Sequence, residues 1–324
     1  MPIRSACSLW PKERLSSDVR AGRFPAMSLR LKRHQKPALH GSLYFPGESI
    51  PGDDAKNGTM KRVVLFFLLQ LAAPSCQVDY HPYDTRVRGE CGINAKNMAR
   101  IEAATAGRTS VRFAVISDTQ RWYDETAAAV SALNGRGDLD FVLHAGDMAD
   151  FGMKAEFERQ RDILNRLRVP YVVLLGNHDC LATGEEIFHR IFGDFNFAFT
   201  AGCVRIVCLN TNALEFDPRE PVPDFGFIES ELTTRPAGIP KTVVAMHAKP
   251  CTEQFGTNVA KVFQLAITQF PGLQCCINGH GHNFKVEDVF GDGVLYYECD
   301  NIAKRSYLLF TIDETGYECE RIPF

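Results

Sequence analysis

The sequence lacks several patterns that mark particular classes of protein. None of its 11 cysteines forms a C-x-x-C pair, so the paired spacing of a zinc framework is absent. It has no internal repeat, no low-complexity tract and no linker that would separate a second domain. What remains is an ordinary globular composition, and 324 residues allow one large domain or two small ones.

The main part of the sequence also lacks a basic surplus. Residues 1–59 carry 10 Lys and Arg against 5 Asp and Glu, whereas residues 76–324 carry 24 against 34, a net charge of 24 − 34 = −10. An acidic protein is not attracted to the phosphates of nucleic acids in general. We therefore expect no nucleic-acid binding.

The apolar run Val63–Ala73 is too short for a permanent membrane anchor, because a helix needs about 20 apolar residues to cross a hydrocarbon core of ~30 Å. The run follows Lys61 and Arg62 and precedes Pro74-Ser75-Cys76, which is the layout of a signal peptide. A buried core helix is the alternative for residues 60–76.

The end of this segment resembles the lipobox of bacterial lipoproteins, although Ala73 and Pro74 depart from the usual leucine-rich pattern. The resemblance implies an exported bacterial lipoprotein, periplasmic or associated with the outer membrane, with a lipid anchor through Cys76. Cleavage by ordinary signal peptidase is the alternative. Since a signal peptide belongs at the start of a chain, we expect Met60 to be the initiator and residues 1–59 to be a mis-assigned start or a disordered leader.

From residue 110 to residue 324 the chain alternates short β-branched apolar runs with amphipathic stretches, which predicts one α/β domain. The first part is predicted to run β-α-β-α-β, with strands at 111–117, 141–145 and 171–175 and helices at 123–134 and 153–167. Further strands are predicted at 203–209, 242–247, 274–278, 285–290, 293–298, 306–312 and 317–322. Residues 77–109 are interpreted as an N-terminal extension on the surface, with one helix near 94–104.

Metal-competent side chains follow five of these strands, where open α/β sheets bind their ligands. In chain order the motifs are D-x-Q at 118–120, G-D-x-x-D at 146–150, G-N-H-D at 176–179, a single histidine at 247 and G-H-x-H at 279–282. Each motif alone is a weak indication, since an Asp after a strand is more often a helix cap and G-N-H-D is more often a turn. Their occurrence in series indicates a shared site.

This series resembles that of the calcineurin-like metallophosphoesterases, whose pattern is D-x-H, G-D-x-x-D, G-N-H-[DE], H and G-H-x-H. The resemblance covers roughly residues 111–312. It implies a four-layer α/β/β/α sandwich with two mixed β-sheets. It also implies a hydrolase of phosphate esters, a phosphomonoesterase or a phosphodiesterase, in which a hydroxide shared by two divalent metal ions attacks phosphorus.

The resemblance further implies which residues hold the metals. They are Asp147 as the bridge, Asp118, Gln120 and His282 at the first ion, and Asn177, His247 and His280 at the second. The chemistry agrees, because two divalent ions about 3.5–4 Å apart need a bridging anion, oxygen and imidazole ligands, and open positions for water and substrate.

His178 has no ligand role in that family and is implied to act on the leaving group as an acid or charge stabiliser, with Asp150 orienting its ring. A helix-capping role for Asp150 is the alternative. His144 lies inside a predicted strand, either facing away from Asp147 or buried, so we assign it no role.

The departure from the family pattern is Gln120, where most members have histidine. An amide oxygen is a neutral ligand that can coordinate a hard divalent ion. Among Mn²⁺, Mg²⁺, Fe²⁺ and Zn²⁺, we therefore expect the first site to favour Mn²⁺ or Mg²⁺ over Zn²⁺, with Mn²⁺ preferred.

Three segments between the motifs should shape the substrate pocket, namely 180–192, 210–227 and 249–263. The residues in them that are of a type to contact phosphate or stack on a base are Asn212, Arg219, Phe225, Phe227 and Lys249. Ordinary packing is the commoner role of such residues, and they identify no substrate. No inserted cap domain is visible, which favours an open site and a small phosphate-ester substrate. The alternatives are a nucleotide or nucleoside-diphosphate pyrophosphatase and a non-catalytic surface lipoprotein that keeps its metals structurally.

Overall fold

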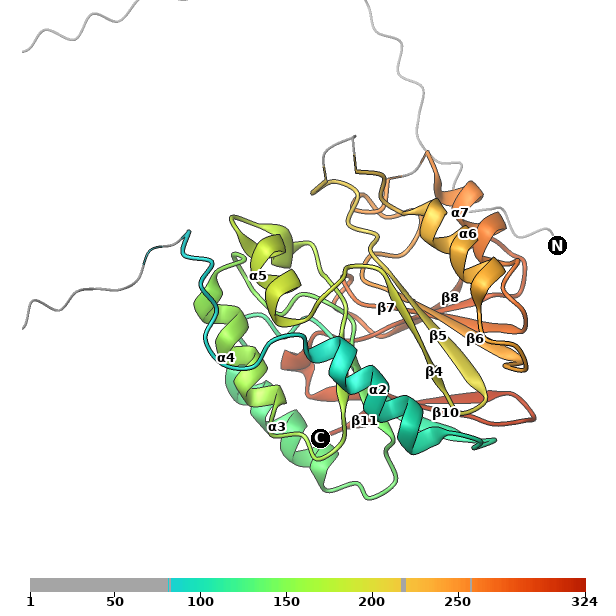
Figure 1. Cartoon of the computed structure of the whole chain (residues 1–324), viewed down its shortest axis with the longest axis horizontal. Helices are drawn as coiled ribbons and strands as arrows, with labels where there is room; N and C mark the ends of the chain where they lie inside the picture. Colours follow the sequence, from blue (N-terminus) through green and yellow to red (C-terminus); the bar gives the residue numbers. More distant parts are fainter. Residues whose placement is uncertain (1–80, 82, 217–219, 257) are drawn as a thin grey trace, which may run out of the picture. The chain divides into compact units, whose positions relative to one another are not determined.

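Two β-sheets pack face to face in this protein, and helices cover their outer faces (Figure 1). The computed structural model describes residues 81, 83–216, 220–256 and 258–324. The predicted leader 1–59, the predicted signal segment 60–76 and Arg219 lie outside the described residues.

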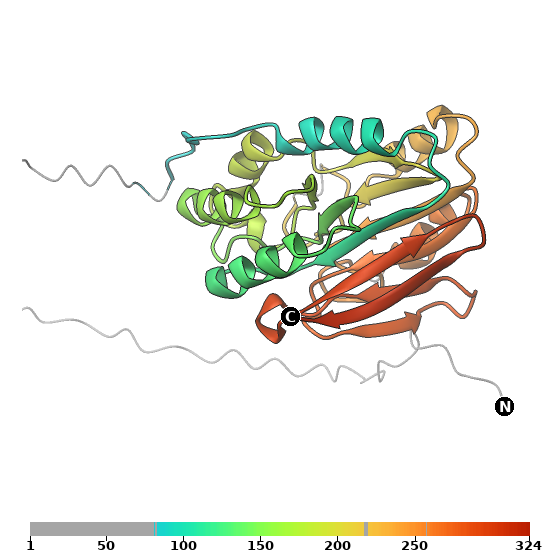
Figure 2. The ribbon, with the colours of Figure 1, turned by 90° about the horizontal axis from the view of Figure 1, so that it is seen from below.

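The first sheet has five strands in the order β11-β10-β1-β2-β3. β1, β2 and β3 run parallel, whereas β10 and β11 are antiparallel to their neighbours, so the sheet is mixed. Figure 2 shows the red strands β10 and β11 beside β1. The strands are β1 (Val111–Ile116), β2 (Phe141–His144), β3 (Tyr171–Val173), β10 (Ser306–Ile312) and β11 (Tyr317–Pro323). All five strands predicted in these places are confirmed.

The second sheet has six strands in the order β4-β5-β6-β7-β9-β8. It too is mixed, because β5, β6, β7 and β9 run parallel and the edge strands β4 and β8 are antiparallel. The strands are β4 (Phe197–Ala201), β5 (Val204–Leu209), β6 (Lys241–Met246), β7 (Leu273–Asn278), β8 (Lys285–Asp288) and β9 (Leu295–Glu298). The sequence predicted each of these except β4.

Three apolar cores hold the layers together. The middle core lies between the sheets. One outer core lies between the first sheet and the helices α3 (Tyr123–Asn134), α4 (Lys154–Leu164) and α5 (Gly184–Ile191). The other lies between the second sheet and the helices α6 (Phe225–Thr234) and α7 (Ala260–Ile267). This is the expected α/β/β/α sandwich with two mixed sheets, and its two helical layers stand at the left and the upper right of Figure 1.

Helix α2 (Ile93–Thr105) covers the edge of the first sheet, although we expected residues 77–109 to lie on the surface. The side chain of Asn94 donates to the carbonyl of Val173 at 2.8 Å and accepts from its N–H at 2.9 Å. Ile101 enters the middle core. The helix thus pairs the free backbone groups of edge strand β3, which would otherwise be open to another chain.

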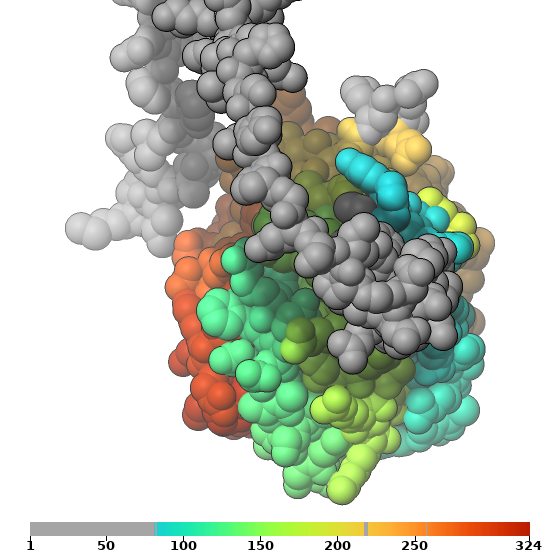
Figure 3. All heavy atoms as spheres, turned by 90° about the vertical axis from the view of Figure 1, so that its left-hand side faces the viewer, coloured from blue at the N-terminus to red at the C-terminus, as the bar shows by residue number. Residues whose placement is uncertain are grey.

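Two short 3-10 helices complete the described elements. η2 (His178–Cys180) follows β3, and η3 (Ile302–Lys304) precedes β10. η3 lies against α3, so the C-terminal part of the chain, red and orange in Figure 3, shares one face with the green helix α3. Neither element was anticipated from the sequence.

The described residues contain neither a disulfide nor a membrane-spanning helix. The nine cysteines among them are all free. No helix in this part of the chain has the length and apolar character that crossing a bilayer requires.

Candidate metal centre

The seven predicted metal ligands converge at the edge where strands of both sheets end. They are supplied by the loops after β1 (Asp118, Gln120), β2 (Asp147), β3 (Asn177), β6 (His247) and β7 (His280, His282). The backbone joins these loops, since the N–H of Asp118 donates to the carbonyl of Gly146 at 3.0 Å and that of Gly279 donates to the carbonyl of His247 at 3.1 Å. Parallel strands place their carboxyl ends together, which is why motifs far apart in the sequence meet here.

A first group of ligand atoms is formed by Asp118, Asp147 and His282, whose candidate atoms lie within 4.8 Å of one another. The Nε2 atom of His282 lies 3.2 Å from Oδ1 of Asp118. Gln120 joins this group, because its Nε2 donates to Oδ2 of Asp147 at 3.2 Å. Its Oε1 atom is buried and has no hydrogen-bond partner within the described residues. A buried oxygen that accepts no hydrogen bond needs another partner, and a bound metal ion would be one.

A second group surrounds Asn177. Its Oδ1 atom lies 3.1 Å from Nε2 of His247 and 3.0 Å from Nδ1 of His280. Nε2 of His247 also lies 3.4 Å from Oδ2 of Asp147, the oxygen that accepts the hydrogen bond from Gln120. Asp147 therefore stands where the two groups meet, which is the position of a bridging ligand.

The protonation of His247 explains why these atoms fit a cation. Its Nδ1 donates to the carbonyl of Ala145 at 2.7 Å, because a carbonyl can only accept, and this directs Nε2 toward the oxygens of Asn177 and Asp147. Burial lowers the pKa of His247, but the charge of Asp147 and the contact with it raise that pKa to about 9. A cation is thus favoured between this nitrogen and these oxygens. A divalent metal ion satisfies the same need, so the residues present fit the metals that the sequence predicts.

His280 differs from His247 in charge. Burial and the charge of His247 lower the pKa of His280 to about 4. Its imidazole is therefore neutral at physiological pH, which is the form that binds metals.

Four of the seven residues hold a strained backbone. Asp118, Asp147, His280 and His282 have φ values of 52°, 61°, 70° and 60°. This left-handed region costs a residue with a side chain about 1–2 kcal/mol. Such strain persists where the surrounding structure enforces it, and it clusters at functional sites.

The glycines of the motifs are required by close approach of the loops. A Cβ atom added to Gly176 would lie 2.1 Å from the backbone nitrogen of Asp147. One added to Gly146 would lie 2.5 Å from Nδ1 of His247. Both distances are far below van der Waals contact, so a side chain at either glycine would push the candidate ligands apart.

Sequence reasoning assigned no role to Asp179, the last residue of G-N-H-D. Its buried carboxylate accepts from four backbone N–H groups at 2.7–3.0 Å. The donors are Asp147, Met148, Ala149 and Gly176. Asp179 thus fixes the loop that carries Asp147 against the loop that carries Asn177. The position of Asp179 inside the G-N-H-D motif was the feature of the sequence that could have indicated this role.

His144 is buried, as expected, and it also supports the site. Its Nδ1 accepts from the N–H of Gly146 at 3.2 Å, so the ring proton is on Nε2, which lies 2.8 Å from Oγ1 of Thr119. The neutral ring therefore ties the D-x-Q loop to the loop of Asp147. Burial lowers its pKa to about 4, which keeps the ring neutral.

His178 lies beside Asp147 and Asp150. Its backbone N–H donates to Oδ1 of Asp147 at 3.0 Å, and its Nδ1 donates to the backbone carbonyl of Asp150 at 2.9 Å. The Asp150 carboxylate is farther away, with Oδ1 3.9 Å from Nδ1, and it forms an ion pair with Arg121. The direct contact with the imidazole thus comes from the carbonyl of Asp150, whereas the sequence suggested its side chain.

The alternative role for Asp150, as the cap of helix 153–167, is wrong. The helix is preceded by Met153 as its N-cap. Oε2 of Glu156 accepts from the N–H groups of Phe151 and Met153 at 3.0 and 3.1 Å. Glu156 is therefore the acid that caps this end of α4.

The other residues that the sequence singled out have structural partners. Lys249 forms ion pairs with Glu287 and Glu298. Asn212 is buried and donates to the carbonyl of Leu175 at 2.9 Å. Phe225 and Phe227 pack against the core under α6 and α7. Each of these four residues thus has contacts within the described part of the chain.

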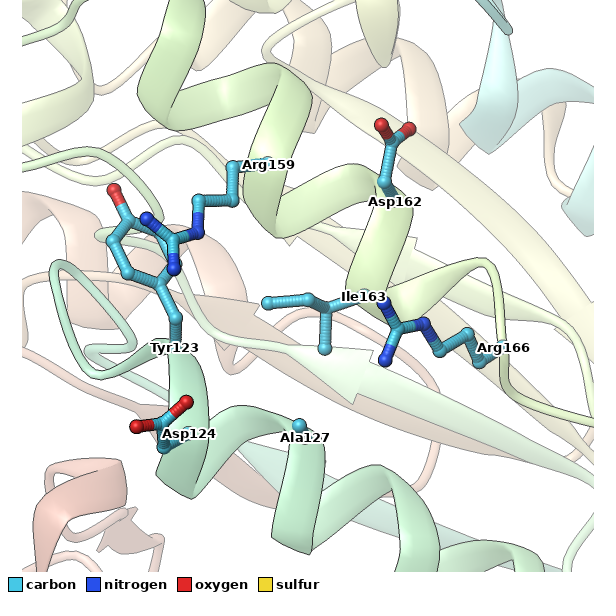
Figure 4. Close-up of a pocket in the computed structure, with 7 residues that line it drawn as sticks. All are labelled: Tyr123, Asp124, Ala127, Arg159, Asp162, Ile163 and Arg166. Carbon is cyan, nitrogen blue, oxygen red and sulfur yellow. The ribbon is translucent and has the colours of Figure 1, made fainter.

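A hollow of about 460 Å³ lies between α3 and α4 (Figure 4). It is lined by Tyr123, Asp124, Ala127, Arg159, Asp162, Ile163 and Arg166. The guanidinium of Arg159 lies over the ring of Tyr123, 3.9 Å from its centroid. None of the predicted site residues lines this hollow, so it is separate from the candidate metal centre.

Known sequences share the motif region. The sequence model of the calcineurin-like phosphoesterases matches residues 111–284. A 3′,5′-cyclic-nucleotide phosphodiesterase of Nostoc sp. is 24% identical over 155 residues, which are 45% of this chain and 57% of that protein. A probable cyclic nucleotide phosphodiesterase of Rhodopseudomonas palustris is 30% identical over 94 residues, 25% of this chain and 33% of that protein. The chain therefore spans less than two thirds of either relative.

Solved structures share the fold. A dimetal phosphatase from Danio rerio superposes with a TM-score of 0.53 and 13% identity, over 66% of this chain and 99% of that one. A purple acid phosphatase from yellow lupin superposes with a TM-score of 0.51 and 14% identity, over 66% of this chain and 51% of that one. At these identities the likeness shows the α/β/β/α sandwich alone.

Proposed function

This chain belongs to the calcineurin-like phosphoesterase family, and from that premise we propose that it hydrolyses phosphate esters with two divalent metal ions. The observation that carries the proposal is the position of Asp147, one carboxylate in contact with both groups of candidate ligands. Asp118, Gln120 and His282 would complete the first metal site. Asn177, His247 and His280 would complete the second.

The bound ions would supply positive charge to the phosphate oxygens and lower the pKa of water toward 7. The protein supplies the positioning. The carbonyl of Ala145 holds the proton of His247 on Nδ1, which keeps Nε2 for the site. Asp179 and His144 fix the loops around Asp147.

His178 would act on the leaving group. Its Nδ1 is committed to the carbonyl of Asp150, which leaves Nε2 as the nitrogen available to a substrate. A protonated ring there would donate to the leaving oxygen, the role of a general acid. Asp150 would act as a positioning residue, through its carbonyl and through its ion pair with Arg121.

Phosphodiesters are the substrate class we favour. Two relatives are named as cyclic nucleotide phosphodiesterases, which supports 3′,5′-cyclic nucleotides as the first candidates. For the metal we favour Mn²⁺ or Mg²⁺ at the first site, because the unpartnered atom of Gln120 is a neutral amide oxygen.

The test is hydrolysis by the purified full chain loaded with Mn²⁺. It is offered a 3′,5′-cyclic nucleotide, an aryl phosphodiester, an aryl phosphomonoester and a nucleoside-diphosphate ester. We expect turnover of the diesters, lost together with tight metal binding in Asn177→Ala and kept in Asn165→Ala, a matched change at the end of α4. Tight metal binding without turnover of any ester would favour a non-catalytic protein. If Asn177→Ala bound metal as tightly as the wild-type chain, the proposed set of metal ligands would be wrong.

We also propose that residues 60–76 direct export and that Cys76 carries a lipid. The basic pair, the apolar run and the position of the cysteine support this. Expression with labelled palmitate should label the wild-type chain and leave Cys76→Ser unlabelled. Equal labelling of both chains, or of neither, would contradict the anchor.

A further inference from the structure

Large apolar side chains remain exposed in the loops that build the metal centre. Trp122 follows the D-x-Q loop, Phe151 follows Asp150, and Leu181 follows η2. Their exposed fractions are 39%, 56% and 36%. Single exposed apolar residues are common on protein surfaces, but a group of them beside a candidate active site marks a place for a ligand.

Direct contacts join the three loops around His178. The ion pair between Arg121 and Asp150 links the loop of Trp122 to the loop of Phe151. A Cβ atom added to Gly152, the neighbour of Phe151, would lie 1.9 Å from the carbonyl oxygen of Leu181, so these two backbones pack against each other. The N–H of Leu181 in turn donates to the carbonyl of His178 at 3.3 Å. The three loops that carry these apolar residues therefore meet beside His178.

From this arrangement we propose that Trp122, Phe151 and Leu181 form an apolar subsite that binds an aromatic group of the substrate, such as a nucleobase. The inference rests on the proposed function, because it places the organic part of a phosphate ester beside the group that would act on its leaving oxygen. Aromatic side chains bind bases by stacking, which tolerates any base because each has a π face.

The charge where the three loops meet is complementary to an ester that carries both an aromatic group and a phosphate. The Arg121 side chain is 64% exposed, whereas its partner Asp150 is 7% exposed. The guanidinium thus faces solvent while its partner is buried, and it is available to a phosphate oxygen. Arg121 follows the candidate ligand Gln120 directly, and its ion pair with Asp150 holds the guanidinium near the loop of His178.

The first experiment compares two phosphodiesters that differ only in the leaving alcohol, which carries an aromatic ring in the aryl ester and a methyl group in the methyl ester, with the acidity of the two alcohols matched. In Trp122→Ala and Phe151→Ala, we expect kcat/KM for the aryl ester to fall about tenfold relative to that for the methyl ester, mainly through KM. Leu265→Ala is the matched control, since Leu265 lies on α7 and is 68% exposed. An unchanged ratio in both aromatic variants, or an equal change in Leu265→Ala, would overturn the proposal.

A second readout does not depend on turnover. The chain has two tryptophans, Trp10 and Trp122, so the Trp10→Phe variant reports on Trp122 alone. With Mg²⁺ present, adenosine 5′-monophosphate should quench its fluorescence at lower concentration than glycerol phosphate does, and Phe151→Ala should weaken that response.

Equal responses to the two phosphates, or none, would overturn the subsite. A response confined to vesicles of phosphatidylglycerol would also overturn it, in favour of a lipid-binding surface. Quenching by the nucleotide in a protein that hydrolyses no ester would keep the subsite and reject the proposed function.

Discussion

The middle core differs in kind from the metal edge, the place where β1, β2, β3, β6 and β7 end. The same strands build both regions, but the first is packed with apolar side chains and the second holds buried polar groups. In the middle core, Phe113 stacks between Phe141 and Phe310, with ring centroids 4.7 and 5.3 Å away, and all three are fully buried. At the metal edge, residues with side chains hold left-handed backbone, carboxylates are buried, and the oxygen of Gln120 has no partner in the described residues. The free energy of the core offsets the strain at the edge, so stability and activity should respond to different residues.

The largest effect should come from Asp147→Ala at the metal edge. Loss of the bridging carboxylate should lower kcat/KM for a phosphodiester by about 10⁴-fold, because metal charge is worth several kcal/mol in the transition state. The unfolding midpoint of the metal-free protein should change by less than about 4 °C. Steady-state kinetics and thermal denaturation test this, and a variant that unfolds readily would break the contrast.

Phe113→Ala should have the reverse signature. Removing a fully buried ring should lower the free energy of unfolding by about 4 kcal/mol, through lost transfer energy and a residual cavity. Metal affinity of the folded protein should stay unchanged. Denaturant titration measures the first and calorimetric titration the second, with Val262→Ala on the surface of α7 as the control. A large loss of metal affinity in the folded variant would show that the two regions are coupled.

The buried ring of His144 should make the stability of the protein depend on pH. Its pKa is about 4 in the folded metal-free chain and 6.5 in the unfolded one. The unfolded state binds the proton more tightly, so this contribution to stability is complete above pH 6.5. It is lost as the pH falls toward 4, by about 3 kcal/mol.

The control for this prediction is His144→Gln, which removes the titrating ring. The variant should be less stable at pH 7, because the contacts with Thr119 and Gly146 change. Its stability should nevertheless fall less steeply than that of the wild type between pH 6.5 and 4. Parallel stability curves from denaturant titration would refute the assignment.

The smallest effect concerns Asp179, which supports the metal edge from behind. Asp179→Asn replaces one acceptor oxygen by an N–H₂ group that faces backbone donors, and it should weaken metal binding about 10–100-fold. Asp288→Asn is the matched control, because Asp288 also accepts several backbone N–H bonds but in the exposed turn after β8. Equal metal affinity in Asp179→Asn and Asp288→Asn would show that Asp179 does not position the metal ligands.

The strands and the ligand motifs were predictable because each depends on a local pattern. β1 (V-R-F-A-V-I) and β6 (K-T-V-V-A-M) are rich in buried β-branched and apolar residues, and Asp118 and His247 follow them within two residues. Strand β4 was missed because it is an edge strand in which only alternate residues are buried, so it lacks a continuous apolar run. Helix α2 looked peripheral because its packing depends on Asn94 pairing with Val173 of a distant strand.

Within the candidate site, the sequence identified the side chains that converge at the candidate metal centre but not those that bond to the backbone. Asp179 and His144 act through N–H groups that the fold brings to them, and no residue spacing encodes such contacts. The carbonyl of Asp150 is similar, because a backbone atom makes the contact that the side chain was expected to make.

The most direct test of the central claim is electron paramagnetic resonance of the full chain loaded with Mn²⁺. Two ions held on either side of Asp147 should give the spectrum of a spin-coupled pair, and Asp147→Ala should convert or abolish it. A wild-type protein that shows isolated Mn²⁺ ions at saturation would contradict the account, because the two groups of ligands would then not share one carboxylate.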